Sequence, residues 1–159
     1  MPCYLFTWHA NATWMPDRQQ GFVLKGRGIQ PPDAARAMSY RARQKEEAAY
    51  FNEAVQRLII DECLIAAEHR RFRVHGVATE PTHVHVLISW SDDRTFEELR
   101  RGLRESISRR LNARRRRPWL EQGGSRKRVE HRAHFNYLMD RYQPKHSGWK
   151  WREGVGYYR

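Results

Sequence analysis

The sequence is poor in cysteine, has no long hydrophobic run and carries few acidic residues. Its 159 residues include 2 cysteines, Cys3 and Cys63, in no metal-site or redox spacing, and we expect both to be core residues. No segment approaches the apolar length of a membrane span, and the first residues lack the basic and apolar regions of a secretion signal. These absences exclude a disulfide scaffold and a membrane-spanning protein. They predict a cytoplasmic protein.

The shortage of acidic residues leaves a large positive charge. There are 18 Asp and Glu against 30 Lys and Arg, a formal net charge of +12. Such a surplus favours a polyanionic partner, nucleic acid before membrane, because clustered Arg and Lys release counterions from phosphates. The alternative is a merely soluble basic surface. With 40% hydrophobic residues, the chain predicts one globular domain over residues 1–159.

Hydrophobic periodicity and turn residues predict alternating strands and helices. The expected elements are strands at 3–9, 72–79, 82–90 and 126–130, and helices at 46–68, from Thr95 onward and at 132–142. Thr95 and Glu98 form a capping box. Residues 11–42 are predicted to form a long loop or insertion with a binding role, and residues 147–159 a C-terminal tail. This order predicts an α+β fold, a ferredoxin-like antiparallel sheet with helices packed on one face and a site on the other.

The strand at 82–90 carries a His-x-His motif. Chance gives about 0.4 such pairs in a chain with this many histidines, so the motif alone is a weak signal. However, alternation puts Val84, Val86 and Ile88 on one face of the strand, and His83 and His85 together on the other. Neutral imidazoles at this spacing predict a metal site. The alternative is a pair of exposed strand histidines.

The last predicted helix carries two tyrosines, Tyr137 and Tyr142. A tyrosine held near a cation can attack a phosphodiester and retain the DNA end covalently. Helical phasing puts Tyr142 on an apolar stripe, which predicts a core residue, and puts Tyr137 on the polar face. Tyr137 is therefore the predicted nucleophile, although a plain surface tyrosine fits the same pattern.

Taken together, these features resemble the single-tyrosine HUH transposases of insertion sequences, the IS200-like family, and their domesticated relatives, the REP-associated tyrosine transposases. The resemblance covers most of the chain and rests on Phe6–His9, Thr13–Asp17, Gly21–Val23, Glu80–Leu87, Gly123–Arg126 and Tyr137. It implies a ferredoxin-like fold, a homodimer, and a bacterial, nucleoid-associated protein. It also implies Mg²⁺- or Mn²⁺-dependent strand transfer on single-stranded or hairpin DNA, through a 5′-phosphotyrosine intermediate.

The chain departs from this family at one position. The family usually carries Gln or Asn four residues after the tyrosine as a third metal ligand, and counting from Tyr137 that position is Arg141. A guanidinium has no lone pair to give a cation. Either another group completes the metal site, or metal binding is weak, or catalysis has been lost. The alternative function is thus a catalytically weak or inactive hairpin-binding or single-strand-binding protein.

Arginine is concentrated between residues 100 and 117, where a helical apolar side holds the segment to the body and leaves the arginines outward. Such a face binds backbone phosphates without reading bases. The predicted DNA-binding residues are Arg100, Arg101, Arg104, Arg114, Arg115, Arg116, Arg117, Arg126, Lys127 and Arg128. A solvated basic helix end is the alternative. Tryptophans such as Trp14 and Trp119 can stack unpaired bases, although each one singly also fits a packing role. A further alternative is a basic RNA-binding module. Its sheet would present aromatic residues where this strand presents His83 and His85, which is evidence against that function.

Overall fold

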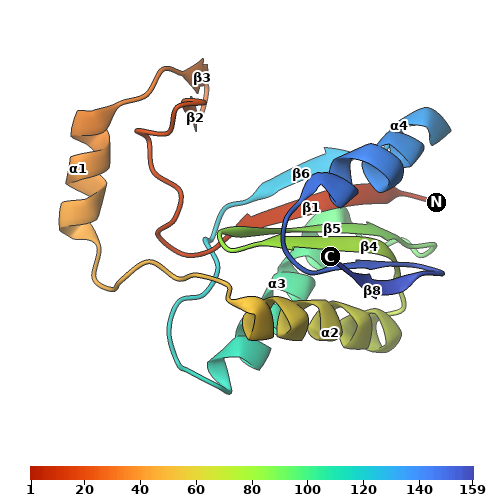
Figure 1. Ribbon diagram of the computed structural model, residues 1–159. Helices are drawn as coiled ribbons and strands as arrows, with labels where there is room; N and C mark the ends of the chain where they lie inside the picture. Colours follow the sequence, from red (N-terminus) through yellow and green to blue (C-terminus); the bar gives the residue numbers. More distant parts are fainter.

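Six strands form one antiparallel sheet in the computed structural model, which describes residues 1–159 (Figure 1). The strands are β1 (Cys3–His9), β4 (Arg73–Glu80), β5 (His83–Ser89), β6 (Ser125–Arg128), β7 (Lys150–Arg152) and β8 (Gly156–Tyr158). Their order across the sheet is β6-β1-β5-β4-β7-β8. The tail, for which the sequence gives no clear period, contributes the two strands β7 and β8 at one edge.

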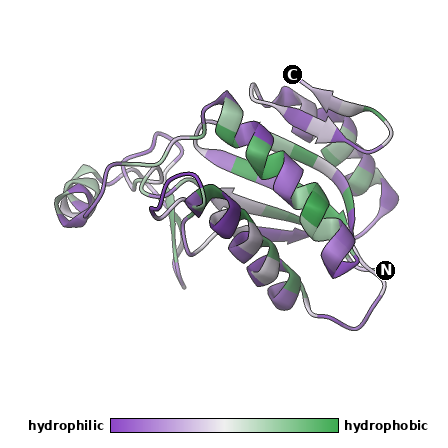
Figure 2. Cartoon of the chain, turned by 90° about the horizontal axis from the view of Figure 1, so that it is seen from below, coloured by the Kyte–Doolittle hydropathy of each residue, from purple (hydrophilic) through white to green (hydrophobic).

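The two long helices, α2 (Glu53–Arg70) and α3 (Phe96–Asn112), pack side by side on one face of the sheet. The main core lies between them and the sheet, and it includes the buried side chains Phe6, Trp8 and Val86. Figure 2, seen from below, shows these helices crossing the near side of the sheet. None of the helices combines the length and the apolar character needed to cross a lipid bilayer.

A short helical segment covers part of the opposite face (Figure 1). It consists of α4 (Arg132–Tyr137), one π-helical turn η1 (Leu138–Tyr142) and a 3₁₀ turn η2 (Gln143–Lys145). Leu138 and Met139 pack there on Leu5 and Leu87 of the sheet. The expected arrangement of helices on one face therefore holds for the two long helices, while the last helix lies across the face that carries the histidines.

The chain order β1-α2-β4-β5-α3-β6 and the central strand order β6-β1-β5-β4 are those of a ferredoxin-like βαββαβ unit. This confirms the predicted α+β fold class. The capping box at the start of α3 is also present, with Thr95 accepting from the backbone of Glu98 and Glu98 accepting from that of Thr95.

One helix begins later than the sequence predicts. The periodicity indicates a helix from residue 46, whereas α2 begins at Glu53. The residues before it are extended because their backbones bond elsewhere. Ala49 donates to the carbonyl of Asn11, and Phe51 donates to that of Pro81. Asn52 then caps α2 by accepting from the amide of Val55.

The predicted long loop contains secondary structure of its own. Within it lie β2 (Phe22–Leu24) and β3 (Gly28–Gln30), which pair with each other, and α1 (Ala34–Arg43), which Asp33 caps. We call residues 14–48 the arm. Figure 1 shows the arm standing apart from the body, joined to it by two chain segments. An ion pair between Arg41 and Asp17 ties α1 to the start of the arm.

Candidate metal and tyrosine site

The two histidines of the motif project from the face of β5 that α4 and η1 cover. The alternation along β5 sends Val84, Val86 and Ile88 into the core beneath α2 and α3. His83 and His85 therefore share the opposite face, with their ring centroids 4.8 Å apart.

A third histidine completes the cluster. His146 follows η2, and one possible ligand atom from each of His83, His85 and His146 lies within 4.8 Å of the others. His146 is buried, at 8% exposed, and its ring centroid lies 4.6 Å from that of His85. The sequence analysis missed this residue, because nothing in the local pattern of residues 143–147 shows that the chain folds back over β5.

Each ring of the cluster has its Nδ1 near a side-chain oxygen. The pairs are Thr82 Oγ1 with His83 at 3.1 Å, Thr7 Oγ1 with His85 at 2.7 Å, and Glu80 Oε1 with His146 at 3.3 Å. The Glu80 carboxylate can only accept, so it favours the tautomer of His146 in which Nδ1 carries the proton and Nε2 carries the lone pair. The threonine hydroxyls can also accept, and they are compatible with the same tautomer of His83 and His85. The Nε2 atom of His146 is buried without any hydrogen-bond partner. A buried nitrogen in that condition is costly, and the donor set fits a divalent cation.

Burial also sets the protonation of these rings. It lowers the pKa of His83 to about 4 and that of His85 to about 2, with further lowering from the neighbouring histidines. Burial lowers the pKa of His146 as well, although Glu80 opposes this effect. The imidazoles are therefore neutral near pH 7, which is the form that binds a metal.

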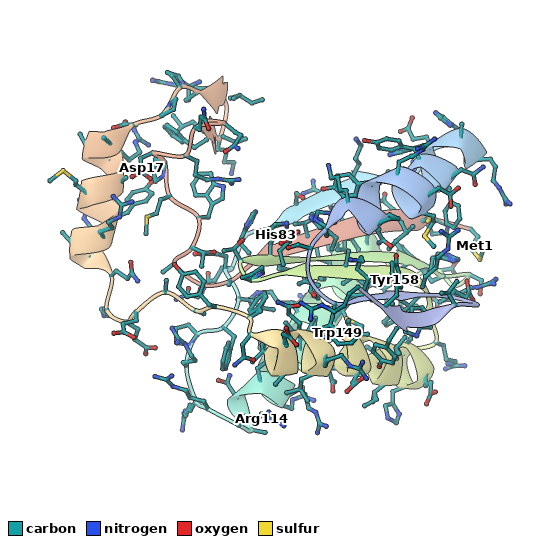
Figure 3. All side chains as sticks on the ribbon, in the orientation of Figure 1. Met1, Asp17, His83, Arg114, Trp149 and Tyr158 are labelled. Carbon is teal, nitrogen blue, oxygen red and sulfur yellow. The ribbon has the colours of Figure 1, made fainter.

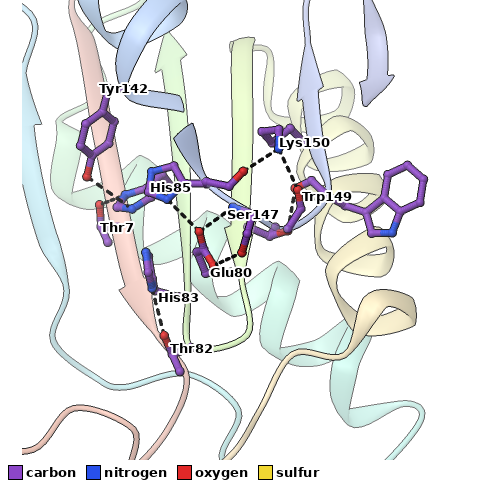
Figure 4. Close-up of polar contacts among 12 residues, drawn as sticks. Thr7, Glu80, Thr82, His83, His85, Tyr142, Ser147, Trp149 and Lys150 are labelled. Carbon is purple, nitrogen blue, oxygen red and sulfur yellow. Dashed lines mark hydrogen bonds and ion pairs between the residues drawn. The ribbon is translucent and has the colours of Figure 1, made fainter. Parts of the chain in front are cut away.

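The segment that carries His146 is held by two buried or half-buried charges (Figure 4). Glu80 accepts hydrogen bonds of 2.7 Å from both the amide and the hydroxyl of Ser147. The ammonium of Lys150, 2% exposed, donates to the carbonyls of His146 and Gly148 at 2.6 and 3.1 Å. These bonds position the third histidine over the strand.

The two tyrosines of the last helical segment lie differently from each other. The hydroxyl of Tyr142 is 3.4 Å from His85 Nε2, as Figure 4 shows, and its ring centroid is 5.2 Å from that of His146. Tyr137 is 53% exposed, its ring is tilted against that of Tyr142 with the centroids 6.4 Å apart, and it makes no hydrogen bond to a histidine. Burial raises the pKa of Tyr142.

Helical phasing describes Tyr142 only in part. Tyr142 does pack beside Leu138 and Met139, as the apolar stripe predicts. However, that stripe lies on the same sheet face as His83 and His85, so its last residue reaches the histidines. Phasing within one helix cannot reveal this, because it gives no information on which face of the sheet the helix covers.

Arg141, which takes the expected third-ligand position after Tyr137, is exposed. Gln143 is 1% exposed and lies against Gly76 of β4, where any larger residue than glycine would collide with its side chain.

The predicted DNA-binding arginines fall into two groups. Some hold the protein's own backbone: Arg100 donates to the carbonyls of Gly123 and Gly124, and Arg104 to those of Leu120 and Glu121. Arg117 belongs to the same group, since it donates to the carbonyl of Glu47. The exposed members without such bonds are Arg101, Arg114, Arg115, Arg116, Arg126, Lys127 and Arg128.

The tryptophans are mostly structural, since Trp119 is buried and Trp149 and Trp151 pack against the core.

The solved structures that share this fold include two transposases. A REP-associated tyrosine transposase bound to a REP hairpin matches with a TM-score of 0.51 and 8% identity, over 87% of this chain and 62% of that one. A putative transposase from Deinococcus radiodurans matches with a TM-score of 0.52 and 13% identity, over 92% of both chains. No protein-family model and no curated protein matches the sequence. The chain has the fold of these transposases. It spans less than two thirds of the length of the REP-associated protein.

Proposed function

We propose that this protein is a transposase-like enzyme that cleaves and rejoins single-stranded DNA, with a divalent cation held by His83, His85 and His146. The observation that carries the proposal is the convergence of three neutral imidazoles beside a tyrosine hydroxyl. Three imidazoles bind Mn²⁺ more readily than Mg²⁺, which prefers oxygen ligands. When bound, the cation would polarise the scissile phosphate and stabilise the negative charge that develops during attack.

We assign the nucleophile to Tyr142, while Tyr137 stays the choice favoured by the sequence pattern. Two observations support Tyr142. Its hydroxyl lies next to His85, whereas that of Tyr137 makes no bond to a histidine. In addition, the residue four positions after Tyr142 is His146, which can bind a metal, whereas the residue four positions after Tyr137 is Arg141, which cannot. The resembled family has a metal ligand at this spacing from its tyrosine.

The reaction exchanges one phosphodiester for another. The Tyr142 oxygen forms a bond to phosphorus, the bond from phosphorus to the 3′ oxygen breaks, and the proton lost by the phenol ends on the released 3′-OH. Attack by a second 3′-OH on the phosphotyrosine reverses these steps, joins two strands and restores the phenol. Because burial raises the pKa of Tyr142, we expect attack to need the nearby positive charge of the metal.

The test is covalent capture of a 3′-labelled hairpin or single-stranded oligonucleotide library in Mn²⁺, read on a denaturing gel. The label must be at the 3′ end, because the phosphotyrosine keeps the protein on the 5′ end of the downstream fragment. We expect Tyr142→Phe to abolish the protein–DNA adduct and Tyr137→Phe to retain it. The two substitutions are matched, since each removes one hydroxyl. Loss of the adduct in Tyr137→Phe alone would return the assignment to Tyr137.

The alternative function is a DNA-binding protein without strand transfer. It predicts no adduct from the unsubstituted protein at any Mn²⁺ concentration, together with salt-dependent binding of the same oligonucleotides. The exposed arginines Arg114 to Arg116 support DNA binding under either function, because their side chains are free to contact phosphates.

A further inference from the structure

A large cleft lies between the arm and the body, next to the histidine cluster. Its volume is about 1070 Å³, and its walls include Trp14, Tyr40, Arg43 and Lys45 from the arm and Gly123 and Gly124 from the body. We call this space the arm cleft. Nothing in the strand-transfer mechanism uses it.

The arm cleft is continuous with the proposed metal site through His9. His9 lines the cleft and pairs with His83 across β1 and β5, with the two ring centroids 5.6 Å apart. Figure 3 shows His83 at the end of the sheet that faces the arm. A strand with its phosphate at the histidines therefore has the arm cleft as its adjoining space.

Part of the body wall of the cleft is bare backbone, at Gly123 and Gly124. Gly123 and Gly124 lack side chains, and Gly124 has a φ of +115° and lies close to the carbonyl of Thr7, so a larger residue is excluded there. Arg100 holds both glycine carbonyls at 2.9 and 2.7 Å. The wall is thus fixed in place and open to a flat or extended ligand.

The arm wall combines aromatic rings with positive charge. Trp14 and Tyr40 supply the rings, and Arg43 and Lys45 supply the charge. The arm as a whole has seven Lys and Arg against four Asp and Glu. Two carboxylates, Glu46 and Glu121, also line the cleft, and Glu121 is occupied in accepting from the amide of Ala12. Aromatic faces beside cations are the combination that binds unpaired bases and their phosphates.

We infer that the arm cleft binds the unpaired nucleotides that adjoin the scissile phosphate, stacking bases on Trp14 and Tyr40 and pairing phosphates with Arg43 and Lys45. This inference rests on the proposed function. A second copy of the chain is a poorer occupant, because its arm and body carry the same positive charge. Duplex DNA is also a poorer occupant, because its bases are stacked on one another.

The test is fluorescence anisotropy of a labelled single-stranded oligonucleotide in EDTA, where no strand transfer occurs. We expect the double change Tyr40→Ala and Arg43→Gln to weaken binding by about 10- to 100-fold. Tyr40 is 42% exposed, so its removal leaves the fold intact. The matched control is Met38→Ala, also exposed on α1 at 68% but outside the cleft. Unlabelled duplex DNA should displace the labelled single strand from the unsubstituted protein no better than from the double variant, because the cleft is expected to favour unpaired nucleotides.

The outcomes separate this inference from the proposed function. If the cleft variant binds single strands as tightly as Met38→Ala does, the inference is wrong, whatever the adduct assay gives. The unsubstituted protein could form no adduct, while the cleft variant binds single strands more weakly than the unsubstituted protein does. In that case the proposed enzyme activity is wrong and the inference about the cleft holds. A concentration-dependent dimer that disappears in the cleft variant would instead make the cleft a contact between copies and overturn the inference.

Discussion

A cluster of three histidines and a single buried histidine lie beneath the same helical segment, one at each end of the sheet face. At one end, His83, His85 and His146 gather below Tyr142. At the other end, His75 of β4 contacts Phe135 of α4, with ring centroids 5.0 Å apart.

The difference between the cluster and His75 lies in their hydrogen-bond partners. His75 has both ring nitrogens satisfied, Nε2 by the Ser89 hydroxyl at 2.8 Å and Nδ1 by Glu153 at 3.2 Å. In the cluster, His146 has a buried Nε2 with no partner. Burial lowers the pKa at both ends, so the pKa does not distinguish them. The free nitrogen does, because a satisfied histidine has no lone pair left for a metal.

The largest effect that this comparison predicts is on the third histidine. We expect His146→Ala to reduce Mn²⁺ affinity by at least about 100-fold, since it removes a ligand rather than a supporting group. Isothermal titration of Mn²⁺ measures this without any DNA. An unchanged affinity in a folded variant would place the metal elsewhere.

A smaller effect is expected from the carboxylate that holds this histidine. Glu80→Gln keeps an acceptor for Ser147 but removes the charge beside His146 Nδ1. We expect Mn²⁺ affinity to fall by about 10- to 100-fold, with single-strand binding in EDTA unchanged. A loss as complete as that of His146→Ala would mean that Glu80 itself binds the metal.

The smallest effect on the metal is expected at the other end of the sheet. His75→Gln should leave Mn²⁺ affinity unchanged and lower the free energy of unfolding by about 1–3 kcal/mol, because Ser89 and Glu153 lose a buried partner. Urea unfolding measures the second quantity. A matching drop in Mn²⁺ affinity would break the distinction between the cluster and His75.

The sequence alone determined the features that depend on local pattern. Alternation along residues 82–90 is enough to put His83 and His85 on one face, because successive strand side chains point to opposite sides. The capping box at Thr95 and the order of strands and helices are likewise local, and they gave the ferredoxin-like fold. The sequence predicts a long loop or insertion over residues 11–42 but not its helix α1, since the glycines and prolines at residues 26–32 directly before it obscure a short helical period.

Only the tertiary structure decided how distant segments meet. His146 joins the cluster because the chain turns after Pro144 and is fixed there by Glu80, a residue far from it in sequence, together with the nearby Lys150. Tyr142 faces the histidines because the last helix packs on their side of the sheet. An apolar stripe predicts that a helix is packed, and it contains no information on what lies beside the residue at its end.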